Sequence, residues 1–285
     1  MLICRFSVFI LCAASLLLTP TMNFAADKST ADKNAPEAAR LVKVLNSDAD
    51  TYDKAMACRR LAAIGDASSA TAIARYLGDE KLATYARSAL ENIPGPAADK
   101  ALRDALKTVK GNLLVGVINS IGKRKDRGAV DDLTPLLSDK NTNVAIAAAH
   151  AIGEIGTSEA AKALLLALGK GDAKLQQEVG FACLMCAKSL AEAKDNTSAV
   201  ALTTAVRKAN LPENIKLAAT QRAIVLQGKA GLGLLAEQLK SDNLQQFRAG
   251  LQAAQKLGKL STSTLIDAYP KLPEEHKALL VAVLG

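Results

Sequence analysis

Aliphatic residues stand directly before turn residues at regular intervals along this chain. The clearest copies of this anchor are Ile64-Gly65, Ile93-Pro94, Ile121-Gly122, Ile155-Gly156 and Leu257-Gly258, with looser copies at Leu190-Ala191 and Leu226-Gln227-Gly228. Successive anchors are 29, 28, 34, 35, 36 and 31 residues apart. A period in the thirties is the signature of a solenoid built from helix pairs.

A second spacing supports the same repeat. A Leu follows the anchor by 13 residues in four copies, at Leu77, Leu106, Leu168 and Leu239, and the inserted basic turn displaces it to Leu137 in a fifth. Each helix that ends at an anchor is therefore followed by a tight turn, where Gly closes a helix readily, and by another helix. The spacings predict an all-α, right-handed α-solenoid of about eight antiparallel helix pairs over residues 36–285, at 36–64, 66–93, 96–121, 126–155, 157–190, 195–226, 230–257 and 260–284.

Prolines fit this register, since most fall where a helix begins or breaks. Pro36, Pro96, Pro212 and Pro273 are placed at helix starts, the helical position that tolerates proline. Pro135 falls inside a predicted helix, where we expect a kink. Residues 27–35 are polar and aperiodic, which indicates a linker rather than a helix.

The helices that end at the anchors can be aligned into columns. Seven and three residues before the anchor, the columns hold small or aliphatic residues, such as Ala148 and Ile152 in one copy, and these share the anchor's face. The columns five and two residues before the anchor are mostly polar and should line the concave side of the solenoid. They supply the candidate partner-binding residues Arg59, Asn119, His150, Gln221 and Gln252. The alternative is that these columns are simply the solvated face that any surface helix needs.

The first 26 residues differ from everything after them. Arg5 precedes the apolar run 6–18, Pro20 breaks it, and small residues at Ala25-Ala26 suit cleavage. This layout predicts a signal peptide over 1–26, because the run is too short to span a bilayer; an uncleaved membrane anchor is the alternative. We therefore expect an exported protein, periplasmic or secreted, with no transmembrane segment after cleavage.

Composition narrows the classes of function. Hydrophobic residues make up 49% of the chain and aromatic residues only 3%, and removing Arg5 with the signal peptide lowers the net charge from +8 to +7. Lys123, Arg124, Lys125 and Arg127 form the one tight basic cluster, in a predicted turn, and could attract an anionic polymer. Export and the lack of stacking aromatic residues disfavour nucleic acid as a partner.

Residues that carry chemistry are few. Cys183 and Cys186 lack the histidine of a haem attachment site and the further ligands of a zinc site, and Cys183 falls in the small-residue core column. The sequence does not decide whether Cys58, Cys183 or Cys186 form a disulfide. Asp48, Asp50 and Asp53 are better explained by helix capping than by calcium, since Arg59 stands where the bidentate Glu would be. We accordingly expect no metal, no cofactor and no catalytic residue.

One copy of the repeat resembles a known family. Pro135-Leu136-Leu137-Ser138-Asp139, then Val144, Ala147-Ala148-Ala149 and Ile152-Gly153-Glu154-Ile155-Gly156 are similar to the HEAT-like repeats also found in phycobilisome lyases, although Ala145 stands where that family often has Arg. Residues 93–122 also resemble exported bacterial HEAT-repeat proteins with no assigned activity. The resemblance covers 36–285, is strongest over 49–168, and implies a HEAT-type solenoid.

Three functions remain open on the sequence. The first is a non-catalytic scaffold that binds a protein partner along its concave surface. The second, implied only by the resemblance, is a lyase or assembly factor for a pigment or cofactor. The third is a binder of anionic polymer through the basic turn at 123–127. The sequence leaves the partner's identity, the oligomeric state and the pathway undetermined.

Overall fold

Sixteen α-helices and no strand make up residues 28–284, the part of the chain that the computed structural model describes. The helices form eight consecutive pairs, as the anchor spacing predicts. The pairs are α1 (Lys28–Leu45) with α2 (Thr51–Ile64), α3 (Ala67–Ala74) with α4 (Ala83–Asn92), α5 (Pro96–Ala105) with α6 (Gly111–Arg124), α7 (Val130–Leu133) with α8 (Thr142–Ile155), α9 (Ser158–Ala167) with α10 (Ala173–Glu192), α11 (Asn196–Lys208) with α12 (Glu213–Gln227), α13 (Leu232–Leu239) with α14 (Leu244–Leu257), and α15 (Thr262–Ala268) with α16 (Glu274–Leu284). The predicted all-α solenoid is confirmed, and the predicted signal peptide over 1–26 lies outside the described residues.

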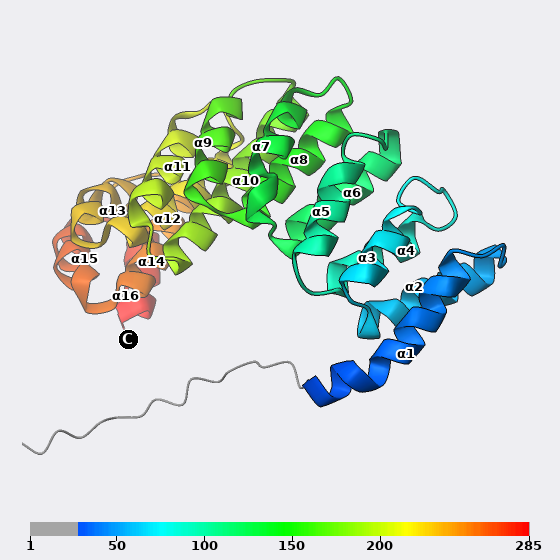
Figure 1. Cartoon of the computed structure of the whole chain (residues 1–285). Coiled ribbons are helices and arrows are strands. Elements are labelled where there is room, and N and C mark those ends of the chain that lie inside the picture. Colours follow the sequence, from blue (N-terminus) through cyan, green and yellow to red (C-terminus); the bar gives the residue numbers. More distant parts are fainter. Residues whose placement is uncertain (1–27, 285) are drawn as a thin grey trace, which may run out of the picture.

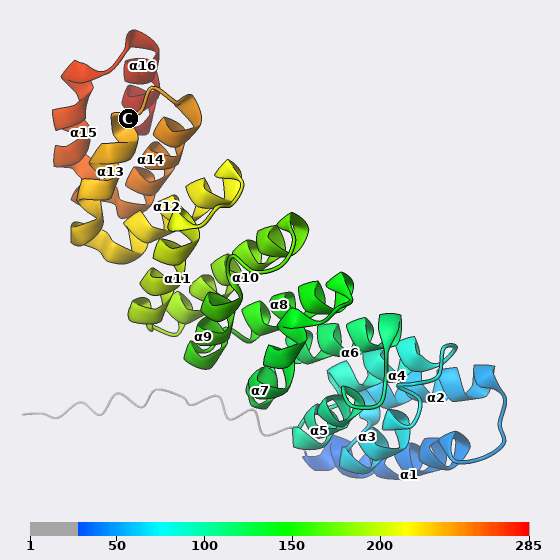
Figure 2. The ribbon, with the colours of Figure 1, turned by 90° about the horizontal axis from the view of Figure 1, so that it is seen from above.

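The pairs stack side by side into an arch (Figure 1). Neighbouring even-numbered helices pack against one another in an unbroken row from α2 to α16. Seen from above, this row follows the inner edge of the bend and the odd-numbered helices follow the outer edge (Figure 2). The helices that end at the anchors therefore line the concave side.

The predicted core columns are buried throughout. Every member of the column seven residues before the anchor is buried, and so is every member of the column three before it; the two columns comprise Ala57, Ala86, Leu114, Ala148, Cys183, Ala219 and Gly250, and Leu61, Leu90, Ile118, Ile152, Ala187, Ala223 and Ala254. Small residues there let neighbouring helices approach closely. Helical periodicity alone thus identifies the face that packs.

Two local predictions about prolines have different outcomes. The linker expected over 27–35 is wrong for residues 28–35, because α1 begins at Lys28 and passes through Pro36. Lys, Ala and Asp in this segment are compatible with a helix, and Pro36 removes only one backbone hydrogen bond from it. By contrast, the chain changes from α-helix to 3-10 helix at Thr134, one residue before Pro135, where we expected a kink.

Side-chain caps fix where several helices begin. Asp50 accepts a hydrogen bond from the backbone N–H of Asp53 at the start of α2, and Asp66, Thr157, Asp172 and Asp195 do the same for α3, α9, α10 and α11. Such a cap satisfies an N–H group that has no partner inside the helix. Capping therefore accounts for Asp50, as the sequence indicates.

The buried residues form two separate hydrophobic cores. The N-terminal core extends from Ala38 to Ala219, and the C-terminal core extends from Ile224 to Leu280. Helix α12 contributes to both, since Ala219 belongs to the first and Ile224 to the second. None of the helices described between residues 28 and 284 combines the length and the hydropathy needed to cross a bilayer.

Candidate binding surface

The concave row exposes polar side chains between its buried columns. Arg59, Asn119 and Gln252 are exposed, Gln221 is partly buried, and the side chain of His150 is 41% exposed. All five lie on even-numbered helices. The structure thus places each candidate partner-binding residue on the concave row, although not in one cluster.

Two of these candidates meet directly across neighbouring repeats. The Gln221 side-chain amide donates to the Gln252 side-chain oxygen at 3.0 Å, linking α12 to α14. Asn119 and His150 line common depressions between α6 and α8. Arg59 lies apart from both groups, on α2.

The polar columns are less continuous than the sequence indicates. Gly116, Gly153 and Ile224 belong to these columns, yet all three are buried. A Cβ on Gly153 would stand 2.8 Å from the carbonyl oxygen of Ala182, so α8 and α10 approach one another at this glycine. The guanidinium of Arg87 covers Gly116, and its Nη1 donates to the Gly116 carbonyl at 3.4 Å. Close helix approach, which the column pattern does not reveal, removes these positions from the surface.

Three depressions on the concave row adjoin one another and form one trough. The first, about 300 Å³, is lined by Glu91, Lys123 and Glu154 together with Asn119 and His150. The second, about 340 Å³, shares Asn119 and His150 with the first and shares Lys174 and Glu178 with the third. The third, about 760 Å³, reaches Asn210, Leu211 and Pro212 before α12. The trough therefore crosses five repeats, from α4 to the start of α12.

Two side-chain pairs hold the walls of the trough. His150 Nε2 lies 2.8 Å from Glu178 Oε2, which joins α8 to α10. Glu91 accepts from Lys123 Nζ at 2.6 Å and from Ser120 Oγ at 2.8 Å, which joins α4 to α6. The pairing with Glu91 raises the pKa of the Lys123 ammonium. Both pairs connect neighbouring repeats and so fix the shape of the concave surface.

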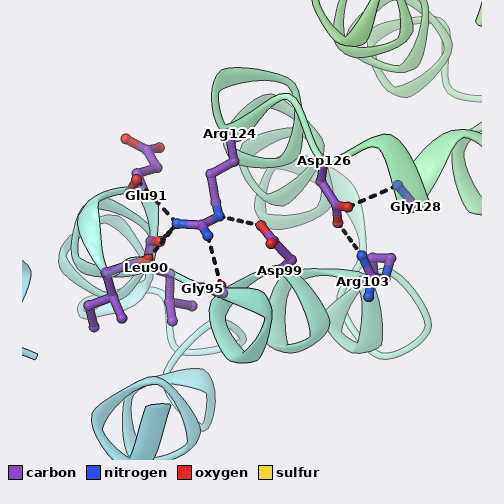
Figure 3. A network of polar contacts seen from close by, with 9 residues as sticks. Leu90, Glu91, Gly95, Asp99, Arg103, Arg124, Asp126 and Gly128 are labelled. Atoms are coloured by element: carbon purple, nitrogen blue, oxygen red, sulfur yellow. Dashed lines mark hydrogen bonds and ion pairs between the residues drawn. The ribbon is translucent and has the colours of Figure 1, made fainter. Parts of the chain in front are cut away.

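Part of the basic turn at 123–127 is structural. Arg124 Nε lies 2.6 Å from Asp99 Oδ1, and its Nη1 donates to the backbone carbonyls of Leu90 at 2.6 Å and Ile93 at 2.7 Å (Figure 3). Its Nη2 donates to the Gly95 carbonyl at 3.1 Å. These carbonyls lie at and just after the end of α4, where a helix has unpaired acceptors and a partial negative charge. With a side chain 9% exposed, Arg124 is a helix cap between repeats rather than a free cation.

The acid within the turn is also engaged. Asp126 accepts from Arg103 Nη1 at 2.5 Å and from the backbone N–H of Gly128 at 3.0 Å (Figure 3). Lys125 closes α6 in the left-handed conformation, with φ of 53°. Of the four basic residues, Lys125 and Arg127 have no ion pair within residues 28–284. The charge that an anionic polymer could use is thus smaller than the sequence indicates.

The three cysteines of the described residues are free thiols buried in the N-terminal core. Burial raises the pKa of the Cys58 thiol to about 11 and that of the Cys183 and Cys186 thiols to about 12. Cys186 Sγ lies 3.8 Å from the Thr157 carbonyl. Thiols in this setting are protonated near neutral pH and unreactive, in keeping with the structural interpretation of Cys183.

Another cavity, about 330 Å³, lies between α13, α15 and the start of α16. His276 borders it and is 2% exposed, and neither of its ring nitrogens has a hydrogen-bond partner within residues 28–284. Both nitrogens are covered, so a molecule in the cavity could not reach them. The ring instead stacks on Phe247, with centroids 4.1 Å apart.

Comparison with known proteins identifies the repeat. The family described as HEAT repeats matches residues 100–182, which include the Arg124 cap and most of the trough. The chain contains HEAT repeats. No curated protein matches it in sequence.

Two solved structures are similar to this chain at low identity. The crystal structure of an engineered protein is 19% identical, with a TM-score of 0.43, over 86% of this chain and 77% of that one. The complex of CpcE and CpcF of phycocyanin lyase from Nostoc sp. is also 19% identical, with a TM-score of 0.42, over 75% of this chain and 92% of that one.

The sequence interpretation missed the residues that complete the trough. Asn112 and Asn143 each precede a candidate, Asn119 and His150, by seven residues. Seven residues are two helical turns, so this spacing could have revealed them. Lys174 and Glu178 lie before the aligned columns of α10, because that helix is 20 residues long.

Proposed function

We propose that this HEAT array is an exported, non-catalytic scaffold that binds a protein partner along its concave surface. The observation that carries the proposal is the trough, a polar depression that continues across five repeats on the inner row of helices. A solenoid offers such a surface because each repeat adds one helix to a continuous concave face. Export rests on the signal-peptide pattern of residues 1–26.

The competing explanation is that the polar concave side chains only solvate the helices. Affinity capture from an extract of the source cells separates the two. Wild-type protein is compared with a variant in which Arg59, Asn119, His150 and Gln221 are all replaced by Ala. A matched control replaces Thr71, Asp131 and Lys162, which are exposed on the outer helices α3, α7 and α9.

We expect the concave variant to lose a captured protein that the outer variant retains, while both melt like the wild type. Equal capture by all three proteins would contradict the proposal. N-terminal sequencing tests export separately, since we expect the mature chain to begin near Ala26 or Asp27. An intact Met1 in the membrane fraction would contradict export.

Anionic-polymer binding has its own test. Charge reversal at Lys123, Lys125 and Arg127 leaves Arg124 in place, so the α4 cap remains. Loss of capture in this variant, with no effect of the concave replacements, would move the binding site to the basic turn.

A further inference from the structure

We infer that the trough binds an extended polypeptide segment of about eight residues, through side-chain amides that pair with its backbone. This inference rests on the proposed function and specifies its partner. It follows from the chemistry of the trough lining, its unpaired charges and its length.

Six amide side chains line the trough, namely Asn112, Asn119, Asn143, Gln176, Gln177 and Asn210. Each carries one acceptor oxygen and two N–H donors, the same groups that a peptide unit needs as partners. Gln176 donates to the Gly171 carbonyl at 2.9 Å, and the other five side-chain amides make no hydrogen bond within residues 28–284. They are therefore available to a ligand.

Four of the polar side chains form a regular array. Asn112 and Asn119 are seven residues apart on α6, and Asn143 and His150 are seven residues apart on α8. Seven residues rise about 10 Å along a helix, which is the length of about three residues of extended chain. Val115, Ile146 and Ala147 form an apolar floor between them. An extended backbone can thus meet amides at regular intervals while small side chains face the floor.

The unpaired charges give the trough two different ends. Lys123 is paired with Glu91 and His150 with Glu178, whereas Glu154 and Lys174 have no ion pair within residues 28–284. Glu154 lies in the last turn of α8 and Lys174 in the first turn of α10. A segment with a basic side chain near Glu154 and an acidic one near Lys174 complements these charges.

Helix geometry gives the distance between these charges. Lys174 lines the same depression as Asn143, near the start of α8. The eleven residues from Asn143 to Glu154 rise about 16 Å along α8, and neighbouring helices lie about 9 Å apart. The diagonal from Glu154 to Lys174 is therefore about 19 Å. An extended chain covers that distance in about six residues, and the third depression adds about two more. The paired and unpaired acids, together with the lack of Phe, Tyr and Trp among the lining residues, disfavour nucleic acid in the trough.

The test uses fluoresceinyl-Gly-Lys-Ser-Val-Ala-Ser-Thr-Glu-amide and the peptide in which the segment from Lys to Glu runs in reverse order, with binding followed by fluorescence anisotropy. We expect one of the two directions to bind. A backbone N-methylated copy of that peptide, with every side chain kept, should bind at least about tenfold more weakly because it lacks the N–H donors. Failure of both peptides to bind, equal binding of the N-methylated copy, or preference for a thymidine oligonucleotide would each overturn the inference.

Matched variants locate the binding. Asn119→Ala and Asn143→Ala should each weaken binding about fivefold. The control Asn92→Ala removes an exposed amide that lies outside the trough and donates to the Ser88 carbonyl of its own helix, and it should leave binding unchanged. Charge reversal at Glu154 together with Lys174 should favour the peptide direction that the wild type rejects. Equal effects of Asn92→Ala and Asn119→Ala would contradict the assignment.

Failure of this inference is distinguishable from failure of the scaffold proposal. If neither peptide binds, but capture still depends on the concave residues, the partner is a folded surface and the scaffold proposal stands. If the peptide binds as expected, but capture does not depend on the concave residues, the trough assignment stands and the scaffold proposal fails.

Discussion

The two hydrophobic cores of this array are built from different side chains. The N-terminal core, from Ala38 to Ala219, consists of Ala, Leu, Ile, Val and Cys among its buried residues. The C-terminal core, from Ile224 to Leu280, contains Phe247, which is fully buried and stacked on His276. In the last repeats a large ring therefore fills space that small side chains and close helix packing fill in the N-terminal core.

The C-terminal region also exposes more apolar surface. Among the described residues, five of the eight exposed large hydrophobic side chains lie there, namely Leu244, Leu260, Ile266, Tyr269 and Val281. Because each repeat contacts only its neighbours, two cores joined through one helix need not unfold together. We therefore expect the C-terminal region to unfold first, and the following predictions test that difference.

The largest effect is expected from Phe247→Ala. Emptying this site should cost about 3–5 kcal/mol, because Phe247 is the only fully buried aromatic side chain among the described residues. Amide hydrogen exchange should become fast in α13–α16, while Cys58, Cys183 and Cys186, all in the N-terminal core, stay protected from alkylation. Alkylation at the same denaturant concentration as the loss of α13–α16 would show that the array unfolds as one unit.

Ile152→Ala is the matching change in the N-terminal core and should cost about 2–5 kcal/mol. Ile152 is fully buried on α8, which packs against α6 and α10. Here the thiols should become reactive at lower urea concentration, the reverse of the Phe247→Ala result. Alkylation that stays at the wild-type urea concentration would place Ile152 outside the cooperative core.

Arg124→Ala should cost about 2–3 kcal/mol, because it leaves Asp99 and the carbonyls at the end of α4 without their partner. Urea unfolding, together with amide hydrogen exchange measured in α4 and α5, checks this loss of stability. The control Arg127→Ala changes the same turn where the side chain is exposed and should stay within about 0.5 kcal/mol. Equal effects would show that the Arg124 contacts do not stabilise the array.

Cys183→Ala should have the smallest effect, about 1 kcal/mol or less at pH 7, because Ala occupies that column in four other repeats. The pKa of the Cys183 thiol is about 12 in the folded protein against an ordinary value near 9, so between these values only the unfolded chain releases the proton. Wild-type stability should then fall by up to about 1.4 kcal/mol per pH unit above pH 9 from this thiol, a loss that the variant lacks. Urea titrations should show that the difference in unfolding free energy between the wild type and Cys183→Ala shrinks or reverses from pH 7 to pH 10. A difference that stays constant would contradict the burial of this thiol.

The sequence alone determined the repeat and its packing face. The anchors recur at the length of one repeat, and the core columns hold residues three, four and seven positions apart on one helix; every member of both columns is buried. Residues at these spacings share one face of a helix, so the helical period by itself identifies that face. The candidate residues Asn119 and His150 were placed on the concave row by the same rule.

Only the tertiary structure decided what those surfaces contain. The bonds of Arg124 join residues 25 to 34 positions apart, and the burial of Gly153 depends on how closely α10 approaches α8. The trough likewise combines side chains from successive repeats, so the pattern of any one helix shows only part of it. Interhelical distance and the direction of long side chains settle these features, and both are properties of packed neighbours rather than of any single helix.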